Sequence, residues 1–192
     1  MLKIAKTETD VHTLLRSRWS ARSFSEKSIS DEDILTMLEA AHWSPSSMNE
    51  QPWRYIVTRR DQDENFEPLW NCLMSGNQPW TQRAPLLLVS VAEQLHKSNG
   101  AANKYALYDV GAANQSLLLQ AASMGILGHL MGGFHADQVH HLFQLPESMM
   151  AVVVIALGYP DMPDKLEEPF RTRELTPRVR KPLAEIVHWN GL

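Results

Sequence analysis

Three arginines gather near the start of the chain, in the segment Arg16-Ser17-Arg18-Trp19-Ser20-Ala21-Arg22. The chain as a whole is acidic, since 18 Lys and Arg residues face 22 Asp and Glu residues and the net charge is −4. Guanidinium groups with hydroxyls beside them form charge-assisted, often bidentate hydrogen bonds to phosphate monoesters. The segment therefore indicates a phosphate-binding site, although a solvated helix end would also explain it.

Three further segments combine small polar residues or glycines with prolines and aromatic residues. They are Ser44-Pro45-Ser46-Ser47-Met48-Asn49-Glu50-Gln51-Pro52-Trp53, Gly76-Asn77-Gln78-Pro79-Trp80 and Met131-Gly132-Gly133-Phe134. Prolines restrict a loop and leave its small polar groups free to face a ligand. Glycine lets a backbone approach a ligand closely. These segments are candidates for the remainder of a binding site.

Motifs for several other chemistries are missing from the sequence. It contains no GxxxxGK[ST] phosphate loop, no GxGxxG after a strand and no GxSxG nucleophile elbow. His135, His140 and His141 lack both the i, i+4 spacing and a carboxylate, so no metal site is expected. Cys72, the single cysteine, has nothing near it in sequence to lower its pKa. An enzyme of this sequence would therefore need a cofactor to supply the reactivity.

Hydrophobic periodicity predicts the elements that must position these segments. We expect helices over residues 10–18, 31–43, 65–74, 105–124 and 137–143, and strands over residues 52–60, 86–92 and 150–157. Residues 76–85 are expected to form a loop and residues 93–103 a mobile surface segment. In the glycine-dense residues 125–133 we expect the backbone to turn or to approach a neighbour closely. Strands that alternate with helices through connections of varying length predict a mixed central β-sheet with helices on both faces.

The chain is expected to form a single domain over residues 1–192, with a proline-rich, charged tail over about 161–192 that lies across the body or a second subunit. The longest uncharged stretch, residues 110–128, holds several polar residues, so it predicts a buried helix and no membrane span. Because that helix is apolar around much of its circumference, we also expect a homodimer. The acidic balance argues against nucleic-acid binding. One cysteine and no signal-like start favour a cytoplasmic protein.

The order RxRxSxRxF, SPSSxNxQPW, NQPW, AP, MGGF and ALGYP, from about Arg16 to Val187, resembles the FMN-dependent nitroreductase family. The resemblance implies an α+β fold and an intertwined homodimer with two FMN molecules at its interface, the tail wrapping the partner. It also implies ping-pong transfer of electrons from NADH or NADPH to nitroaromatics, quinones or similar acceptors. Alternatives are dehalogenation, flavin destruction or a non-catalytic FMN-binding module.

The resemblance also implies the FMN contacts. In chain order they are Arg18, Trp19, Ser20, Arg22, Pro45, Ser46, Ser47, Asn49, Asn77, Met131, Gly132, Gly133, Arg178 and Arg180. The loop from Pro45 to Asn49 is expected to reach the flavin from the partner subunit. Arg18 and Ser20, with Arg178 and Arg180, match phosphate contacts, and Trp19 matches a residue beside the ribityl chain.

The remaining contacts concern the flavin ring. Asn77 matches a contact to the pyrimidine edge, and the backbone N–H of the Gly132-Gly133 turn matches a contact to N5 and O4. Arg22 matches a basic residue near N1 and O2, where reduction places negative charge. The chemistry would occur on FMN with Arg22 and Gly133 assisting, so no acid–base catalyst is expected. Relatives often carry a lysine where this chain has Trp80, so either Arg22 supplies that charge alone or Trp80 forms a wall of the pocket. Residues 93–105 are expected to cover the pocket.

Overall fold

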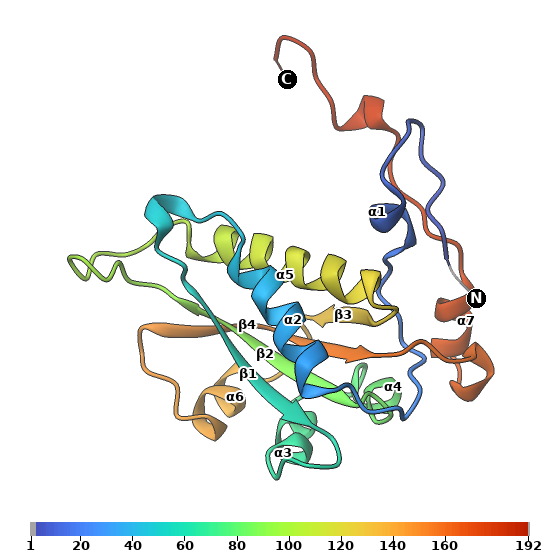
Figure 1. The fold of residues 1–192 in the computed structure, drawn as a ribbon, viewed down its shortest axis with the longest axis horizontal. Helices are drawn as coiled ribbons and strands as arrows, with labels where there is room; N and C mark the ends of the chain where they lie inside the picture. The colour runs from blue at the N-terminus through green and yellow to red at the C-terminus, as the bar shows by residue number, and fades with distance from the viewer. Residues whose placement is uncertain (1–2, 192) are drawn as a thin grey trace.

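The computed structural model describes residues 3–191, which contain one four-stranded sheet (Figure 1). Its strands are β1 (Trp53–Arg59), β2 (Leu86–Glu93), β3 (Leu127–Met131) and β4 (Met149–Gly158). Their order is β1-β2-β4-β3, and each strand is antiparallel to its neighbours. The helices are α1 (Thr13–Ser17), α2 (Asp31–His42), α3 (Phe66–Asn71), α4 (Gln78–Thr81), α5 (Ala106–Ser123), α6 (Ala136–Leu142) and α7 (Phe170–Leu175). Short 3-10 turns are η1 (Ser47–Asn49), η2 (Pro163–Lys165) and η3 (Leu183–Glu185).

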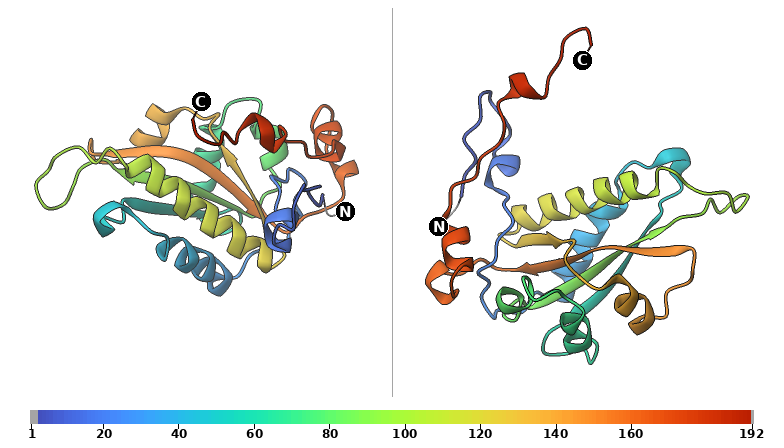
Figure 2. Two further views of the ribbon diagram at one scale, coloured as in Figure 1. Left: turned by 90° about the horizontal axis from the view of Figure 1, so that it is seen from above. Right: turned by 180° about the vertical axis from the view of Figure 1, so that it is seen from behind.

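Helices cover both faces of the sheet, as the sequence predicts (Figure 2). Because successive side chains of a strand point to opposite faces, β2 contributes to two hydrophobic clusters. Leu87 and Val89 pack with residues of α3, α4, α6 and α7. Leu86 and Leu88 pack with α2 and α5 on the other face. The α+β class is confirmed.

The expectation of a mixed sheet is wrong for the described strands, which pair only in antiparallel fashion. The reason is β3, which occupies part of the stretch interpreted as a turn because Gly125 and Gly128 weaken its strand signal. A helix leading directly from β2 to β4 would form a parallel crossover. The chain forms β3 between α5 and β4 and reverses its direction once more there. As a result, β4 runs antiparallel to β2.

Two helices show how local sequence sets their positions. Ser30 caps α2, since its hydroxyl accepts a hydrogen bond from the N–H of Asp33 at 3.1 Å. The short α4 lies within the predicted loop 76–85. Pro79 is tolerated there because it occupies the first turn, where the missing N–H has no helical partner.

The central helix α5 carries two buried polar side chains that fix its neighbours. Asn114 Oδ1 accepts hydrogen bonds from the Tyr55 hydroxyl and the Ser90 hydroxyl, both at 2.9 Å. Asp109 Oδ2 accepts from the backbone N–H of Ser47 at 3.0 Å. These bonds join α5 to β1, β2 and η1. Within residues 3–191, no helix has the length and apolarity that crossing a membrane requires.

The C-terminal segment divides into two parts. Leu166 and Phe170 belong to this chain's own core, so residues 161–175 lie across the body of their own subunit, which is one of the two expected placements. Beyond α7 the chain leaves the body beside the N-terminal segment (Figures 1 and 2). It exposes Val179, Ile186 and Trp189 to 80%, 61% and 87%. The accessible surface of the chain is 11363 Å², which is larger than the about 9,300 Å² expected for a compact monomer of this mass.

Gly128 tests the packing of β3 against α5. A Cβ atom at this position would contact Leu118 Cδ2 and would lie 2.9 Å from Leu157 Cδ2, both in the core. We expect Gly128→Ala to lower the free energy of unfolding by about 1–3 kcal/mol in urea titrations, because overpacking forces side chains from their rotamers. Gly76→Ala is the control, since its Cβ meets nothing within 4 Å and its effect should stay below about 0.5 kcal/mol. Equal stability of the two variants would contradict this packing.

Candidate functional site

Three arginines from the two ends of the chain meet on one surface. Burial lowers the pKa of Arg18, and the nearby charge of Arg180 lowers it further. The pKa of Arg178 is likewise lowered by burial, then by Arg18 and Arg180. Arg178 Nη1 donates to the backbone oxygens of Arg16 at 2.7 Å and Lys3 at 3.2 Å. Within residues 3–191, no carboxylate forms an ion pair with any of the three. Such mutually repelling cations suit a doubly charged anion.

Arg22 lies over an aromatic stack. Its guanidinium carbon is 5.8 Å from the centre of the Trp80 ring, and that indole is buried at 2% exposure. The Trp80 ring in turn lies 4.6 Å from His129 and 6.4 Å from Phe24, measured between ring centroids. Trp80 therefore supports Arg22 by a cation–π contact.

His129 holds the segment that carries Arg22. Its Nδ1 lies 3.0 Å from the backbone oxygen of Ala21, and because a carbonyl can only accept, Nδ1 carries the proton. Burial lowers the pKa of His129 to about 4, and the positive charge of Arg22 contributes to this shift. His129 is therefore neutral at physiological pH.

Glu174 of α7 ties the C-terminal part of the chain to the same segment. Its carboxylate is buried at 5% exposure. Oε1 accepts from the indole N–H of Trp19 at 3.3 Å, and Oε2 accepts from the backbone N–H of Arg22 at 3.1 Å. Burial lowers the pKa of Arg22, and the charge of Glu174 partly offsets that shift. Glu174 thus fixes both the position and the charge environment of Arg22.

Asn77 and Gly133 are brought into direct contact. Asn77 Nδ2 donates to the backbone oxygen of Gly133 at 3.0 Å, and the N–H of Met74 donates to the same oxygen at 3.0 Å. A Cβ atom on Gly133 would lie 2.8 Å from Asn77 Nδ2, so only glycine fits without displacing the amide. The neighbouring Gly132 is exposed. These residues form a polar corner of backbone and amide groups.

The loop from Pro45 to Asn49 lies elsewhere. It contacts the first turn of α5 through Ser47 and Asp109, and Ser46 Oγ accepts from the N–H of Gln51 at 3.0 Å. Its left-handed residues include Asn49, whose φ is 56°. The 18 residues of α5 span about 27 Å, and α1 lies at the opposite end of that helix (Figure 1). A single chain therefore does not bring this loop to the arginine cluster.

The remaining residues that were expected to contact FMN differ in how far they are buried. Ser20 is exposed and follows Arg18 closely in the chain. Trp19 and Met131 have 4% and 2% exposure and belong to the core, so their side chains stabilise the fold and present no open surface. His129 and Glu174 also support this site, although neither stands out in the sequence. Glu174 reads as an ordinary solvated acid among the charges of α7, and His129 lies in the stretch interpreted as a turn.

The sequence predicts neither a metal site nor a reactive cysteine. Among the residues that the structure describes, no group of three or more His, Cys, Asp or Glu side chains could hold a metal ion. Cys72 is buried, and burial raises the pKa of its thiol, which disfavours the reactive thiolate.

We expect the stability of the fold to depend on pH through His129. Its pKa is about 4 in the folded chain and about 6.5 when unfolded, so the unfolded state binds the proton more readily between these values. Stability should therefore fall by about 1–3 kcal/mol as pH drops from about 6.5 to about 4, through this group alone. His129→Asn keeps a donor for the Ala21 oxygen and should flatten this dependence in urea titrations. The exposed His141→Asn should retain it; equal slopes for both variants would contradict the assignment.

The chain is similar to known proteins in both sequence and fold. A model of the family described as "Nitroreductase family" matches residues 15–159. A protein of Archaeoglobus fulgidus, provisionally named as an NADH dehydrogenase/NAD(P)H nitroreductase, is 30% identical over 153 residues, 77% of this chain and 83% of its own. An iodotyrosine deiodinase of Thermotoga neapolitana is 24% identical over 176 residues, 80% of this chain and 90% of its own. A crystal structure described as an oxidoreductase containing FMN shares 31% identity, with a TM-score of 0.92 over 97% of this chain and 94% of that one.

Proposed function

Because the chain belongs to the nitroreductase family, we propose that it is an FMN-dependent oxidoreductase that takes electrons from NADH or NADPH. Its acceptors in this proposal are nitroaromatics, quinones or similar molecules, reduced in alternation with the nucleotide. The observation that carries the proposal is the convergence of Arg18, Arg178 and Arg180 on one surface without a carboxylate partner among the described residues. The similarity to an oxidoreductase that contains FMN supports the same cofactor here.

The chemistry of the donor set fits FMN. The three arginines would hold its phosphate, a doubly charged group that offsets their mutual repulsion. The amide of Asn77 and the backbone at Gly132 and Gly133 would face the polar edges of the ring, where glycine permits close approach. Pro45, Ser46, Ser47 and Asn49 would contribute from a second copy of the chain.

Arg22 is the residue that assists electron transfer in this proposal. When bound, FMN supplies the hydride and electron chemistry that the side chains of this chain lack. Arg22 would place its charge beside the N1 and O2 edge, and a fixed cation stabilises negative charge that develops there. Trp80 and Glu174 act through Arg22, because they fix its side chain and its backbone.

A second copy of the chain completes the site in this proposal. The exposed apolar side chains of residues 176–191 need a surface to cover them, and a partner body offers one. The loop from Pro45 to Asn49 lies at the far end of α5, so a partner could bring its loop to this chain's arginines. Residues 93–105 lie at the same end, since His96 Nδ1 and Glu50 Oε1 are 3.2 Å apart. They would therefore reach the partner's flavin together with that loop.

Reductive dehalogenation is the second candidate, because the deiodinase of Thermotoga neapolitana is among the relatives. The purified protein should be yellow, and NADH or NADPH should bleach it without oxygen. Faster reoxidation by nitroaromatics or quinones than by iodotyrosine would support the first candidate. Protein that takes up no FMN would contradict both, and colour without bleaching would indicate a binding module.

Arg18→Ala tests the phosphate site. A charge-assisted contact contributes about 1.5–3 kcal/mol, so the dissociation constant for FMN should rise by about tenfold to a hundredfold in fluorescence titrations. Arg171→Ala is the matched control, since Arg171 is an exposed arginine that pairs with Glu168. It should leave FMN affinity unchanged. Equal affinity of the two variants would remove Arg18 from the phosphate site.

A further inference from the structure

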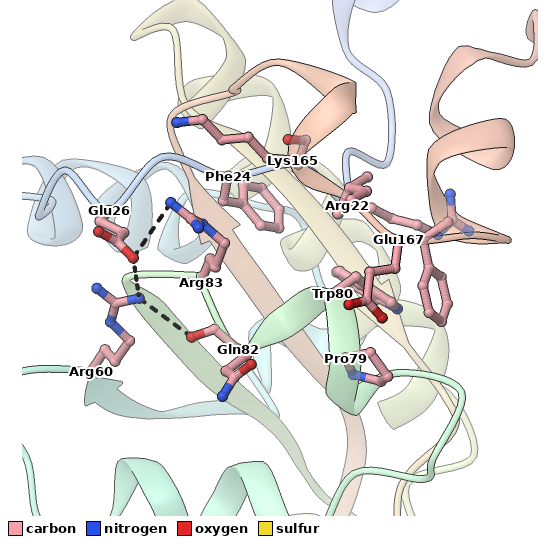
Figure 3. Close-up of a pocket in the computed structure, with 13 residues that line it drawn as sticks. Arg22, Phe24, Glu26, Arg60, Pro79, Trp80, Gln82, Arg83, Lys165 and Glu167 are labelled. Carbon is pink, nitrogen blue, oxygen red and sulfur yellow. Dashed lines mark hydrogen bonds and ion pairs between the residues drawn. The ribbon is translucent and has the colours of Figure 1, made fainter.

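A cavity of about 560 Å³ lies beside the contact between Arg22 and Trp80 (Figure 3). It opens between the segment after Ala21, helix α4 and the η2–α7 region. Of the residues that the sequence connects with the flavin, Arg22 and Trp80 line it, whereas the expected phosphate contacts, the Asn77–Gly133 corner and the Pro45–Asn49 loop do not. The cavity therefore adjoins the proposed flavin site without being part of it. Its volume is typical of small-molecule sites.

The walls of this cavity are aromatic on one side. Phe24, Trp80 and Phe170 line it together with Pro79 and Leu166. All except Pro79 belong to the hydrophobic core and are held in place by it. Phe24 and Trp80 are 1% and 2% exposed, so Phe170 and Pro79 present the apolar surface that a flat ring can contact.

Cationic side chains dominate the polar part of the lining. They are Arg22, Arg60, Arg83 and Lys165, and they face the carboxylates of Glu26 and Glu167. The cations outnumber the acids by two within the lining, and just outside it Asp61 and Asp161 pair with Arg60 and Lys165. Figure 3 shows Arg60 and Arg83 turned toward the same carboxylate.

That shared carboxylate does not satisfy both arginines. Glu26 Oε1 lies 3.9 Å from Arg60 Nη1 and 3.5 Å from Arg83 Nη2, whereas strong charge-assisted bonds measure about 2.7–2.9 Å. Arg83 Nε is buried and has no hydrogen-bond partner among the described residues. Lys165, in contrast, is paired closely with Asp161 at 2.7 Å. Arg60 has further partners, since its Nε lies 3.4 Å from Asp61 Oδ1 and its Nη1 donates to the backbone oxygen of Gln82 at 3.3 Å. Arg83 therefore has the larger capacity for a further anion, with Arg60 beside it.

We propose that this cavity binds an aromatic ring that bears an anionic group, with Arg83 and Arg60 holding the anion and Pro79 and Phe170 contacting the ring. The inference rests on the proposed function, because Arg22 would join the cavity to the flavin edge and bring such a ligand beside it. Two redox substrates carry this chemistry. One is NADPH, through its adenosine 2′-phosphate, and the other is an acidic aromatic electron acceptor.

The test compares charged and neutral ligands of similar shape on the FMN-loaded protein by isothermal titration calorimetry. NADP⁺ against NAD⁺ probes the nucleotide, and 2-naphthoate against 2-naphthamide probes the acceptor. In at least one pair the charged ligand should bind about tenfold more tightly or better. Arg60→Gln/Arg83→Gln should remove that preference and leave the affinity for the neutral ligand unchanged. The control Lys6→Gln/Arg171→Gln removes the same charge outside the cavity lining and should keep the preference.

The outcomes separate this inference from the proposed function. A preference confined to NADP⁺ identifies the nucleotide as the source, and one confined to 2-naphthoate identifies the acceptor. Equal affinities within both pairs, or a preference that survives Arg60→Gln/Arg83→Gln, would overturn the cavity assignment. If the flavin spectrum and its bleaching by NADH or NADPH persist in that case, the proposed function stands without it. Failure to load FMN would instead contradict the proposed function itself.

Discussion

The buried carboxylate of Glu174 is the interaction on which the candidate site depends. It accepts from the Trp19 indole and the Arg22 backbone at once, joining residues more than 150 positions apart. A buried charge with two donors is stable, whereas a buried charge without partners is costly. The same bonds bring the basic segment near the N-terminus to the chain that carries Arg178 and Arg180. The bonds from Arg178 to the backbone of Lys3 and Arg16, and the contact of His129 with Ala21, hold the same segment in place.

The sequence predicts the layers of the fold well because buried strands and amphipathic helices leave strong periodic signals. The strands near residues 53–59, 86–93 and 149–158 and the long helix α5 are of this kind. It does not predict β3, although the close packing of Gly128 against Leu118 agrees with one of the two expectations for the glycine-dense stretch. This single missed strand changes the sheet from mixed to antiparallel.

The candidate site is predictable where a local motif carries the function and unpredictable where the fold supplies the partner. The serine–arginine segment, Asn77 and the glycine pair are visible as short motifs. The environment of Trp80 and the roles of His129 and Glu174 depend on contacts between distant segments, and no local pattern encodes them. The cavity near Arg60 and Arg83 arises in the same way, from four segments that meet only in the folded chain.

The central claim is that each flavin site joins the arginines of one chain to the Pro45–Asn49 loop of another. It is tested most directly by coexpressing Arg18→Ala/Arg178→Ala with Ser47→Ala/Asn49→Ala and measuring bound flavin. Each variant alone should bind FMN weakly. Half of the dimers in the mixture contain one copy of each variant, and each of these has one intact site, so about one quarter of all sites should regain wild-type affinity. A mixture in which no site regains affinity, or a loop variant that binds FMN normally alone, would contradict the claim.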